Sequence, residues 1–447
     1  MRPLRVKELA ELSAIQPNAD TIPTFDACLR PENPEEFVLS ACSTLVAVVN
    51  VGGEKIVQFS HFSVREYLIS HRIAISEHVS RFHILPRPAH ALFARACLGV
   101  LLQLGDRVDR YNIRNSPLAL YAAEYWVDHA QFENVSSDIQ HGMECFFDKN
   151  KPHSEAWLWL YNIDDSSSIY MITYPSLRPY AVPLYYAALC GFHDITEHLI
   201  DAHPQDVNAR GGTRMTSLHA ALDKGHLDVA MLLVEHGADM ESRDFQNQTP
   251  LHIAAHRGYA EAVSLLIDCG ADLDAEKDNQ ATPLYVATKE GRQDIARLLL
   301  EHGADANHRN NCGRTPLHLA SLKGHDEIVR PLFDHDADSN HPDKRGLIPL
   351  HLASLHGYND TARLLLDHGA DANHPDKYGY TPLHVASVEG HNDIVQLLLD
   401  HGASMDHRDM YGFVPLYHAL QEHHTDTVRL LVRHLFGRVL NHPDNGS

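Results

Sequence analysis

The sequence contains 35 histidines, and two of them have a spacing that could bind a metal ion. His252 and His256 are four residues apart, which places two imidazole ligands on one face of a helix. A zinc protease would also need a glutamate after the first histidine, but Ile253 occupies that position. We therefore predict no metal site. His252 is interpreted as a residue that hydrogen-bonds its own and neighbouring turns, and His423 and His424 as part of a solvated helix end.

The other residue types that carry catalysis form no recognisable arrangement. Asp164 and Asp165 adjoin each other in a serine-rich stretch, residues 164–168, that is interpreted as a linker or loop. The cysteines are odd in number and scattered, without a Cys-x-x-Cys pair or a Cys-His signature, which favours buried thiols in a reducing compartment over disulfides, zinc or a nucleophile. We therefore expect no enzyme activity, no catalytic residue, no cofactor and no small-molecule substrate.

Length and charge limit the kinds of partner. A chain of 447 residues with 44% apolar and 21% charged residues is expected to fold, as two or three domains or as one elongated array. The formal charge of -22 disfavours nucleic acid and anionic membranes, which need clustered Lys and Arg. No apolar stretch has the length of a membrane span, and Lys7, Glu8 and Glu11 interrupt any secretory signal. We expect a cytoplasmic protein that can also enter the nucleus.

A repeated pattern fills the C-terminal part of the chain. A Pro-Leu or Ser-Leu pair recurs with a spacing of 34 residues once and then 33 residues six times, beginning at Pro183, Ser217, Pro250, Pro283, Pro316, Pro349, Pro382 and Pro415. Eight residues after this pair begins, each repeat has a glycine, except the last, which has His423. A Gly-Ala-Asp sequence follows in several repeats. Self-similarity at this period is typical of stacked repeat proteins.

The chemistry of one repeat predicts two short helices. Thr381 suits an N-cap and Pro382 the first helical position, while Gly390 can end the helix in a left-handed conformation. Apolar residues then recur at helical spacing in a second helix that ends at Gly402. One such helix pair leaves an apolar stripe in water, so at least about three repeats must stack.

The Thr-Pro-Leu-His sequence at 381–384, the Gly-His pairs at 225, 324 and 390, and the Leu-Leu-Leu-Asp-His-Gly-Ala-Asp sequence at 364–371 together resemble the ankyrin repeat. The resemblance covers about residues 180–441. It implies a curved helical solenoid that binds protein partners through its concave side and its β-turn tips. We therefore expect a mainly α protein in which residues 180–447 form an ankyrin array of about eight repeats.

Residues 1–75 have the pattern of a small winged-helix domain. Helices are predicted at 6–15, 35–42 and 61–70, and two β-rich runs at 45–50 and 55–59 predict a hairpin. Residues 57–68 resemble the winged-helix segment that follows the NTPase module in fungal NACHT-type STAND proteins with ankyrin repeats. Stretches at 89–104, 118–130 and 156–161 resemble their helical connector, which we assign to residues 76–179. The winged-helix region has seven basic and nine acidic residues, which disfavours DNA binding.

The STAND resemblance implies a nucleotide site, but no G-x-x-x-x-G-K-[ST] motif occurs in this sequence. The NTPase module is therefore absent, so that the chain is either a truncated form of a larger protein or works without nucleotide switching. Two functions stay open. The first is a protein-interaction scaffold or sensor that uses the ankyrin array. The alternative is a regulatory subunit of a separate NTPase chain, contacted through residues 1–75.

Positions that the repeat framework leaves free are the candidates for partner binding. These are the tips two, four and five residues before each proline, and the ends of the first helices. In the late repeats the tips become apolar or aromatic, and we expect one contiguous patch there, formed by Leu347, Tyr378, Tyr380, Met410, Tyr411 and Phe413. Packing of neighbouring tips on each other is the structural alternative. Glu389 and Glu422 at the helix ends favour a partner with basic groups around an apolar centre.

Two further features of the repeats concern stability. Pro331 stands where other repeats have leucine, and Asp336 replaces the glycine of a turn, so the helix around 326–335 is expected to be the weakest part of the array. The repeat histidines should be buried and neutral, which would make folding sensitive to mild acid (His219, His252, His318, His351 and His384).

Overall fold

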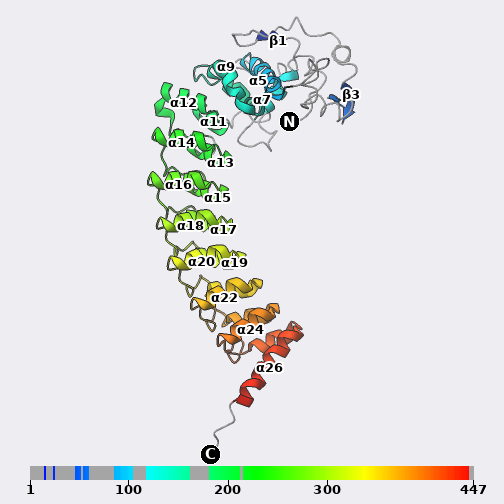
Figure 1. Cartoon of the computed structure of the whole chain (residues 1–447), viewed down its shortest axis with the longest axis vertical. Helices are drawn as coiled ribbons and strands as arrows, with labels where there is room; N and C mark the ends of the chain where they lie inside the picture. Colours follow the sequence, from blue (N-terminus) through cyan, green and yellow to red (C-terminus); the bar gives the residue numbers. More distant parts are fainter. Residues whose placement is uncertain are drawn as a thin grey trace, which may run out of the picture. The chain divides into compact units, whose positions relative to one another are not determined.

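The computed structural model describes residues 85–103, 117–161, 181–211 and 215–441, together with the backbone of four short strands among residues 15–59. The described part is mainly helical (Figure 1). It divides into two compact units, Met1–Ala238 and Asp239–Ser447. The division falls inside the predicted array, so two repeats belong to the first unit and six to the second.

The N-terminal strands form two antiparallel pairs. β3 (Val46–Val51) pairs with β4 (Glu54–Phe59), which confirms the predicted hairpin. β1 (Ile15–Gln16) pairs with β2 (Thr24–Phe25). The predicted helix at 6–15 is therefore wrong at its last residue, because the backbone of Ile15 pairs with Phe25 in a strand. The other residues of the three predicted helices lie outside the described part of the chain, so the winged helix stays a prediction.

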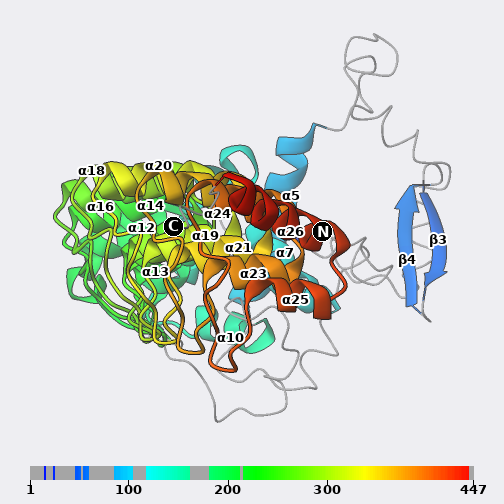
Figure 2. The ribbon, with the colours of Figure 1, turned by 90° about the horizontal axis from the view of Figure 1, so that it is seen from below.

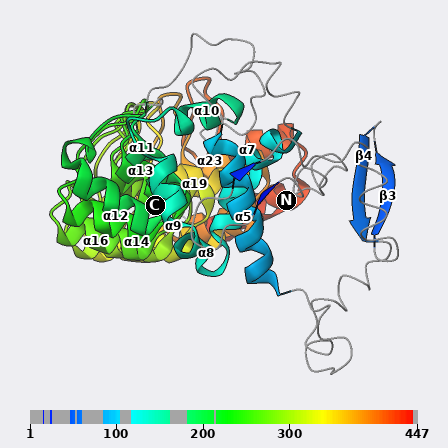
Figure 3. The same cartoon turned by 90° about the horizontal axis from the view of Figure 1, so that it is seen from above.

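Helices occupy the described stretches of the predicted connector. In chain order these are α5 (Pro86–Leu102), α7 (Pro117–Ala130), η4 (Phe132–Asn134), α8 (Val135–Asp138), α9 (Gln140–Phe146) and α10 (His153–Leu160). Figure 3 shows α5, α7 and α9 close together, and α5 packs against both of the others. The helices are therefore held in one bundle within the first unit.

The core of this bundle is aromatic and continues into the first repeat. The ring of Trp126 lies 5.1 Å from that of Phe146 and 5.4 Å from that of Trp157, and all three side chains are fully buried. The indole N–H of Trp157 donates to the carbonyl of Ala123 at 2.8 Å, so its polar atom is satisfied. Phe192 of the first repeat also packs on Trp126, at 5.4 Å. The connector thus covers an apolar face of the first repeat.

Each predicted repeat forms one inner and one outer helix. In the first unit the pairs are α11 (Pro183–Leu189) with α12 (His193–Ala202), followed by the short η7 (Pro204–Asp206), and α13 (Ser217–Lys224) with α14 (Leu227–Glu235). In the second unit they are α15 (Pro250–Arg257) with α16 (Ala260–Asp268), α17 (Pro283–Lys289) with α18 (Gln293–Glu301), α19 (Pro316–Lys323) with α20 (Asp326–Asp334), α21 (Pro349–His356) with α22 (Asn359–Asp367), α23 (Pro382–Glu389) with α24 (Asn392–Asp400), and α25 (Pro415–Gln421) with α26 (Thr425–Asn441). Within the second unit each inner helix packs on the next inner helix, and each outer helix on the next outer one.

The helix ends form as the sequence predicts. The hydroxyl of Thr381 accepts the backbone N–H of His384 at 3.4 Å, and His384 Nδ1 accepts the backbone N–H of Thr381 at 3.1 Å, which is a capping box. Pro382 begins α23, and Gly390 follows its last residue with φ 74°, in the left-handed region. A Cβ atom on Gly390 would lie 2.5 Å from the ring of His424 in the next repeat, so glycine is also required by packing.

The repeat histidine also connects four repeats of the second unit to the repeat that follows. His252 Nδ1 accepts the backbone N–H of Thr249 at 3.2 Å, and its Nε2 donates to the carbonyl of Ala281, 29 residues later, at 2.9 Å. Three more histidines of the second unit make the same bond to the following repeat, at 3.0 to 3.3 Å: His318, His351 and His384. Both nitrogens of His252 are therefore occupied, which confirms its interpretation as a residue that hydrogen-bonds its own and the neighbouring turn.

Helix α20 continues through Pro331. Proline has no N–H to donate to the carbonyl of Glu327, four residues earlier. Asp336 adopts φ 59° in the turn after this helix, where the next repeat has Gly369 at φ 80°. Both features lie where the sequence predicts them, and their effect on stability stays a prediction.

Candidate interaction surface

The tip loops of the last two repeats are held in place by buried or half-buried aspartates. Asp376 Oδ1 accepts the backbone N–H groups of Tyr378 and Tyr380, both at 2.8 Å. Asp409 Oδ1 binds the N–H groups of Tyr411 and Phe413 in the same way, both at 2.9 Å. The carboxylate satisfies these donors from inside the loop, which favours this loop conformation even without a partner.

Neighbouring tips are joined through their backbones. The N–H of Met410 donates to the carbonyl of Tyr378 at 2.9 Å, and that of Lys377 to the carbonyl of Arg345 at 3.1 Å. Figure 2 shows these loops side by side, coloured yellow to orange, along one edge of the helices. Side chains on adjacent tips are thereby brought together although they are a whole repeat apart in the sequence.

Three of the predicted residues form an exposed cluster that we call the apolar tip patch. Tyr378 is 51% exposed, Met410 59% and Tyr411 68%. Large apolar side chains of this exposure bury substantial area when a partner covers them. The structure therefore brings these three together, as the sequence predicts for the late repeats.

Tyr380 and Phe413 lie behind the apolar tip patch and pack against the last inner helix. The ring of Tyr380 lies 5.2 Å from that of His418, and Phe413 is stacked on Tyr417 at 4.0 Å. Phe413 is 37% exposed. Tyr380 and Phe413 therefore match the structural alternative, in which tip residues pack against their neighbours. Their rings support the loops and are also partly exposed to solvent.

Leu347 does not belong to this surface. Its side chain is only 9% exposed, its backbone N–H donates to Asp343 Oδ1 at 3.1 Å, and its carbonyl accepts from His318 Nε2 at 3.0 Å. Phe413 makes the equivalent backbone bonds and stays partly exposed, so these bonds alone do not bury Leu347, whose apolar side chain gains by leaving water. The sequence position alone placed it among the tips, and we exclude it from the candidate surface.

Glu389 and Glu422 are exposed but lie away from the tips. They stand at the far ends of the inner helices α23 and α25, and His424 Nε2 donates to the carbonyl of Val388 at 2.8 Å, which links these ends. An eight-residue helix is about 12 Å long, so this distance separates them from the tip row. The two glutamates therefore lie at the inner-helix ends, as the sequence predicts, in a row separate from the tips.

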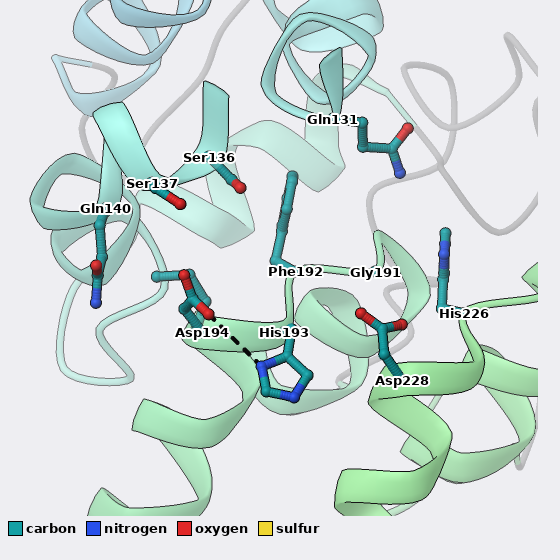
Figure 4. A pocket seen from close by; sticks show the side chains of 11 residues that line it. Gln131, Ser136, Ser137, Gln140, Gly191, Phe192, His193, Asp194, His226 and Asp228 are labelled. Atoms are coloured by element: carbon teal, nitrogen blue, oxygen red, sulfur yellow. Dashed lines mark ion pairs between the residues drawn. The ribbon is translucent and has the colours of Figure 1, made fainter. Parts of the chain in front are cut away.

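A polar hollow of about 530 Å³ lies within the first unit, between the connector helices and the two repeats of that unit (Figure 4). Ser136, Ser137 and Gln140 line it from α8 and α9, and Asp194 and Asp228 from the outer helices. His193 Nδ1 lies 3.5 Å from the carboxylate of Asp194. Among the described residues that line this hollow, no nucleophile is paired with a base. The hollow was not predicted from the sequence, because its lining residues are far apart in the chain.

The repeats match known protein families. Two protein-family models, both described as ankyrin repeats, match the chain: one at residues 241–310, 303–376 and 370–444, and the other at residues 199–254. The chain is an ankyrin-repeat protein. The matched residues include every inner and outer helix of the second unit, so the helix pairs described above are ankyrin repeats and indicate a role in protein–protein interaction.

Two curated proteins are similar to this ankyrin-repeat protein. The azaphilone pigments biosynthesis cluster protein L of Monascus ruber is 28% identical over 257 residues, which cover 52% of each chain. Alpha-latrocrustotoxin-Lt1a of Latrodectus tredecimguttatus is 42% identical over 52 residues, 12% of this chain and 4% of the toxin. The chain thus matches about half the length of the first relative and a small part of the second. Among the described residues, no helix has the length and apolar character needed to cross a membrane.

Proposed function

We propose that this ankyrin-repeat protein is a scaffold or sensor without enzyme activity, and that it binds a protein partner through the apolar tip patch and the concave side of its late repeats. The observation that carries the proposal is the exposure of Tyr378, Met410 and Tyr411 on two hydrogen-bonded tips. Side chains of this kind supply much of the affinity of protein interfaces when they are buried.

The rigidity of the tips supports the same proposal. Asp376 and Asp409 hold the loop backbones, and the bond from Met410 N–H to the Tyr378 carbonyl holds the loops to each other. A partner that docks here does not have to order these loops, so less of its contact energy is lost to conformational entropy. The patch is therefore suited to binding rather than only to packing.

The test compares two matched variants in cells. Met410→Ser removes a tip side chain from the patch. Phe245→Ser removes an apolar side chain that is also 59% exposed and follows the loop aspartate of an earlier repeat, at the equivalent position. Proximity labelling with the wild type and both variants should find proteins that are lost with Met410→Ser and kept with Phe245→Ser. If both variants label the same proteins as the wild type, the patch is not the binding site.

A further inference from the structure

Four basic side chains lie on the tips of three successive repeats in the second unit. They are Arg309, Lys344, Arg345 and Lys377, all exposed, and we call them the basic tip patch. The chain as a whole has a formal charge of -22, so a local excess of cations stands out against its surroundings. Sequence reasoning missed this group because the four residues are spread over two repeat lengths.

The acidic residues of the same loops do not neutralise these cations. Asp343 is buried, where it pairs with Arg314 at 3.1 Å and accepts loop N–H groups. Asp376 likewise accepts the N–H groups of Tyr378 and Tyr380. Within the described ranges, none of the four residues of the basic tip patch forms an ion pair. Their charges are thus available to a ligand in solvent.

The basic tip patch is continuous with the apolar tip patch. The backbone N–H of Lys344 donates to the carbonyl of Cys312 at 2.9 Å, and that of Lys377 to the carbonyl of Arg345 at 3.1 Å. The next bond of the series, from Met410 to Tyr378, lies inside the apolar tip patch. Neighbouring tips are therefore about 5 Å apart at the backbone, as in a β-ladder, and one extended segment can contact both patches.

We propose that the partner of this surface is a protein segment in which Asp and Glu residues stand next to an aromatic or aliphatic anchor. The carboxylates contact the basic tip patch, and the anchor covers Tyr378, Met410 and Tyr411. Glu389 and Glu422, at the far ends of the inner helices, repel such a segment and keep it on the tips. The inference rests on the proposed function and specifies the chemistry of its partner.

The charges favour a protein segment over a nucleic acid. A nucleic acid carries its charge along its whole length, so beyond the four cations it would meet the acidic remainder of the molecule. A protein segment can carry its carboxylates only over the length of the basic tip patch, so it need not place negative charge on the acidic remainder of the molecule. The adjoining apolar tip patch then contacts a side chain that gains from leaving water. This reverses the expectation, drawn from Glu389 and Glu422 alone, of a partner with basic groups.

The test uses a fluorescent peptide with a run of glutamates followed by tryptophan and leucine, and fluorescence anisotropy with the purified full chain. A matched peptide has lysines in place of the glutamates. A charge-reversal variant changes the basic tip patch (Lys344→Glu, Arg345→Glu and Lys377→Glu), and a control variant makes three equal changes at the inner-helix ends (Arg257→Glu, Lys289→Glu and Lys323→Glu). Circular dichroism establishes that both variants fold.

We expect the glutamate peptide to bind the wild type and the control, and to lose at least about tenfold in affinity with the charge-reversal variant. Equal affinity for all three proteins, no binding of the glutamate peptide, or tighter binding of the lysine peptide to the wild type overturns the inference. So does a single-stranded oligonucleotide that binds the basic tip patch when the glutamate peptide does not. The proposed function fails separately, when Met410→Ser leaves proximity labelling unchanged.

Discussion

The Nε2 atom of His418 lies 2.9 Å from Oδ2 of Asp409, a carboxylate with no exposed surface. The other oxygen of Asp409 accepts the N–H groups of Tyr411 and Phe413. Burial alone would raise the pKa of Asp409, but the hydrogen bonds from Phe413, His418 and Tyr411 hold the pKa below its ordinary value. One side chain therefore connects the last tip loop to the last inner helix.

Asp409→Ala is expected to lower the free energy of unfolding by about 1 to 3 kcal/mol, because two backbone donors lose a buried acceptor. Asp406→Ala removes an exposed aspartate three residues away and is the control, with little expected change. Urea denaturation measures both. Equal midpoints for the two variants would show that the loop does not depend on this carboxylate.

Mild acid is expected to destabilise the repeats. Burial lowers the pKa of His252, His318, His351 and His384 to about 4, although each donates to a backbone carbonyl. The folded state therefore binds fewer protons than the unfolded chain, whose histidines titrate near 6.5. The stability that these residues contribute is complete above pH 6.5 and is lost as the pH falls toward 4.

The measurement for this pH effect is the denaturation midpoint at a series of pH values from neutral to about 4.5. Each of the four histidines should steepen the decline by up to about 1.4 kcal/mol per pH unit. A midpoint that stays constant over the series would contradict the prediction.

The contact of Gly390 with the next repeat predicts that alanine at this position destabilises the protein more than alanine at Gly402. Gly390 and Gly402 both have left-handed φ values, 74° and 81°, so alanine is strained at each. A Cβ atom at Gly390 meets the ring of His424 at 2.5 Å, whereas nothing lies within 4 Å of one at Gly402. Gly390→Ala should therefore destabilise the protein by at least about 1 kcal/mol more than Gly402→Ala. Thermal melting of the two variants side by side decides this.

The irregular helix α20 should be the least protected of the outer helices in the second unit. Pro331 removes one helical hydrogen bond, at a cost of up to about 3 kcal/mol, and Asp336 in a left-handed conformation costs about 1 to 2 kcal/mol. Hydrogen exchange should be faster in α20 than in α24. Pro331→Leu combined with Asp336→Gly should slow hydrogen exchange in α20 to the rate found in α24. Equal exchange rates of α20 and α24 in the wild type would show that α20 is not a weak helix.

The repeat helices could be predicted from the sequence because their determinants are local. Thr381, Pro382 and Gly390 fix the ends of α23 by their own backbone chemistry, and the period of 33 residues repeats this signal. Burial at the tips could not be predicted in the same way. Leu347 and Phe413 occupy equivalent positions in their repeats, yet one is buried and the other partly exposed, so the position within the repeat does not decide exposure.

Residues from different repeats that become neighbours in the fold could also not be predicted from local sequence patterns. Arg345 and Lys377 become neighbours only through the backbone bond between their tips. Glu389 lies at the end of an inner helix, as predicted, and the length of α23 separates it from the aromatic tips. The aromatic cluster around Trp126 combines residues from three helices and a repeat, and no periodic pattern identified it.

Two double variants distinguish partner binding from structural support among the aromatic residues of the final repeats. Tyr378→Ala with Tyr411→Ala removes two exposed rings, and no ring contact of either is present among the described residues. Tyr380→Ala with Phe413→Ala removes rings that pack against His418 and Tyr417. The first double variant should keep the melting temperature of the wild type, and the second should lower it.

Affinity for a partner identified by proximity labelling should fall in both variants, but for different reasons. Loss of Tyr378 and Tyr411 should cost 2 kcal/mol or more of binding, about thirtyfold, because central aromatic side chains of an interface commonly contribute that much. Loss of Tyr380 and Phe413 should weaken binding in proportion to the loosening of α25, visible as faster hydrogen exchange there. If the first variant binds as tightly as the wild type while the second does not, the partner contacts the supporting rings and the concave side, and the exposed tips are not its anchor.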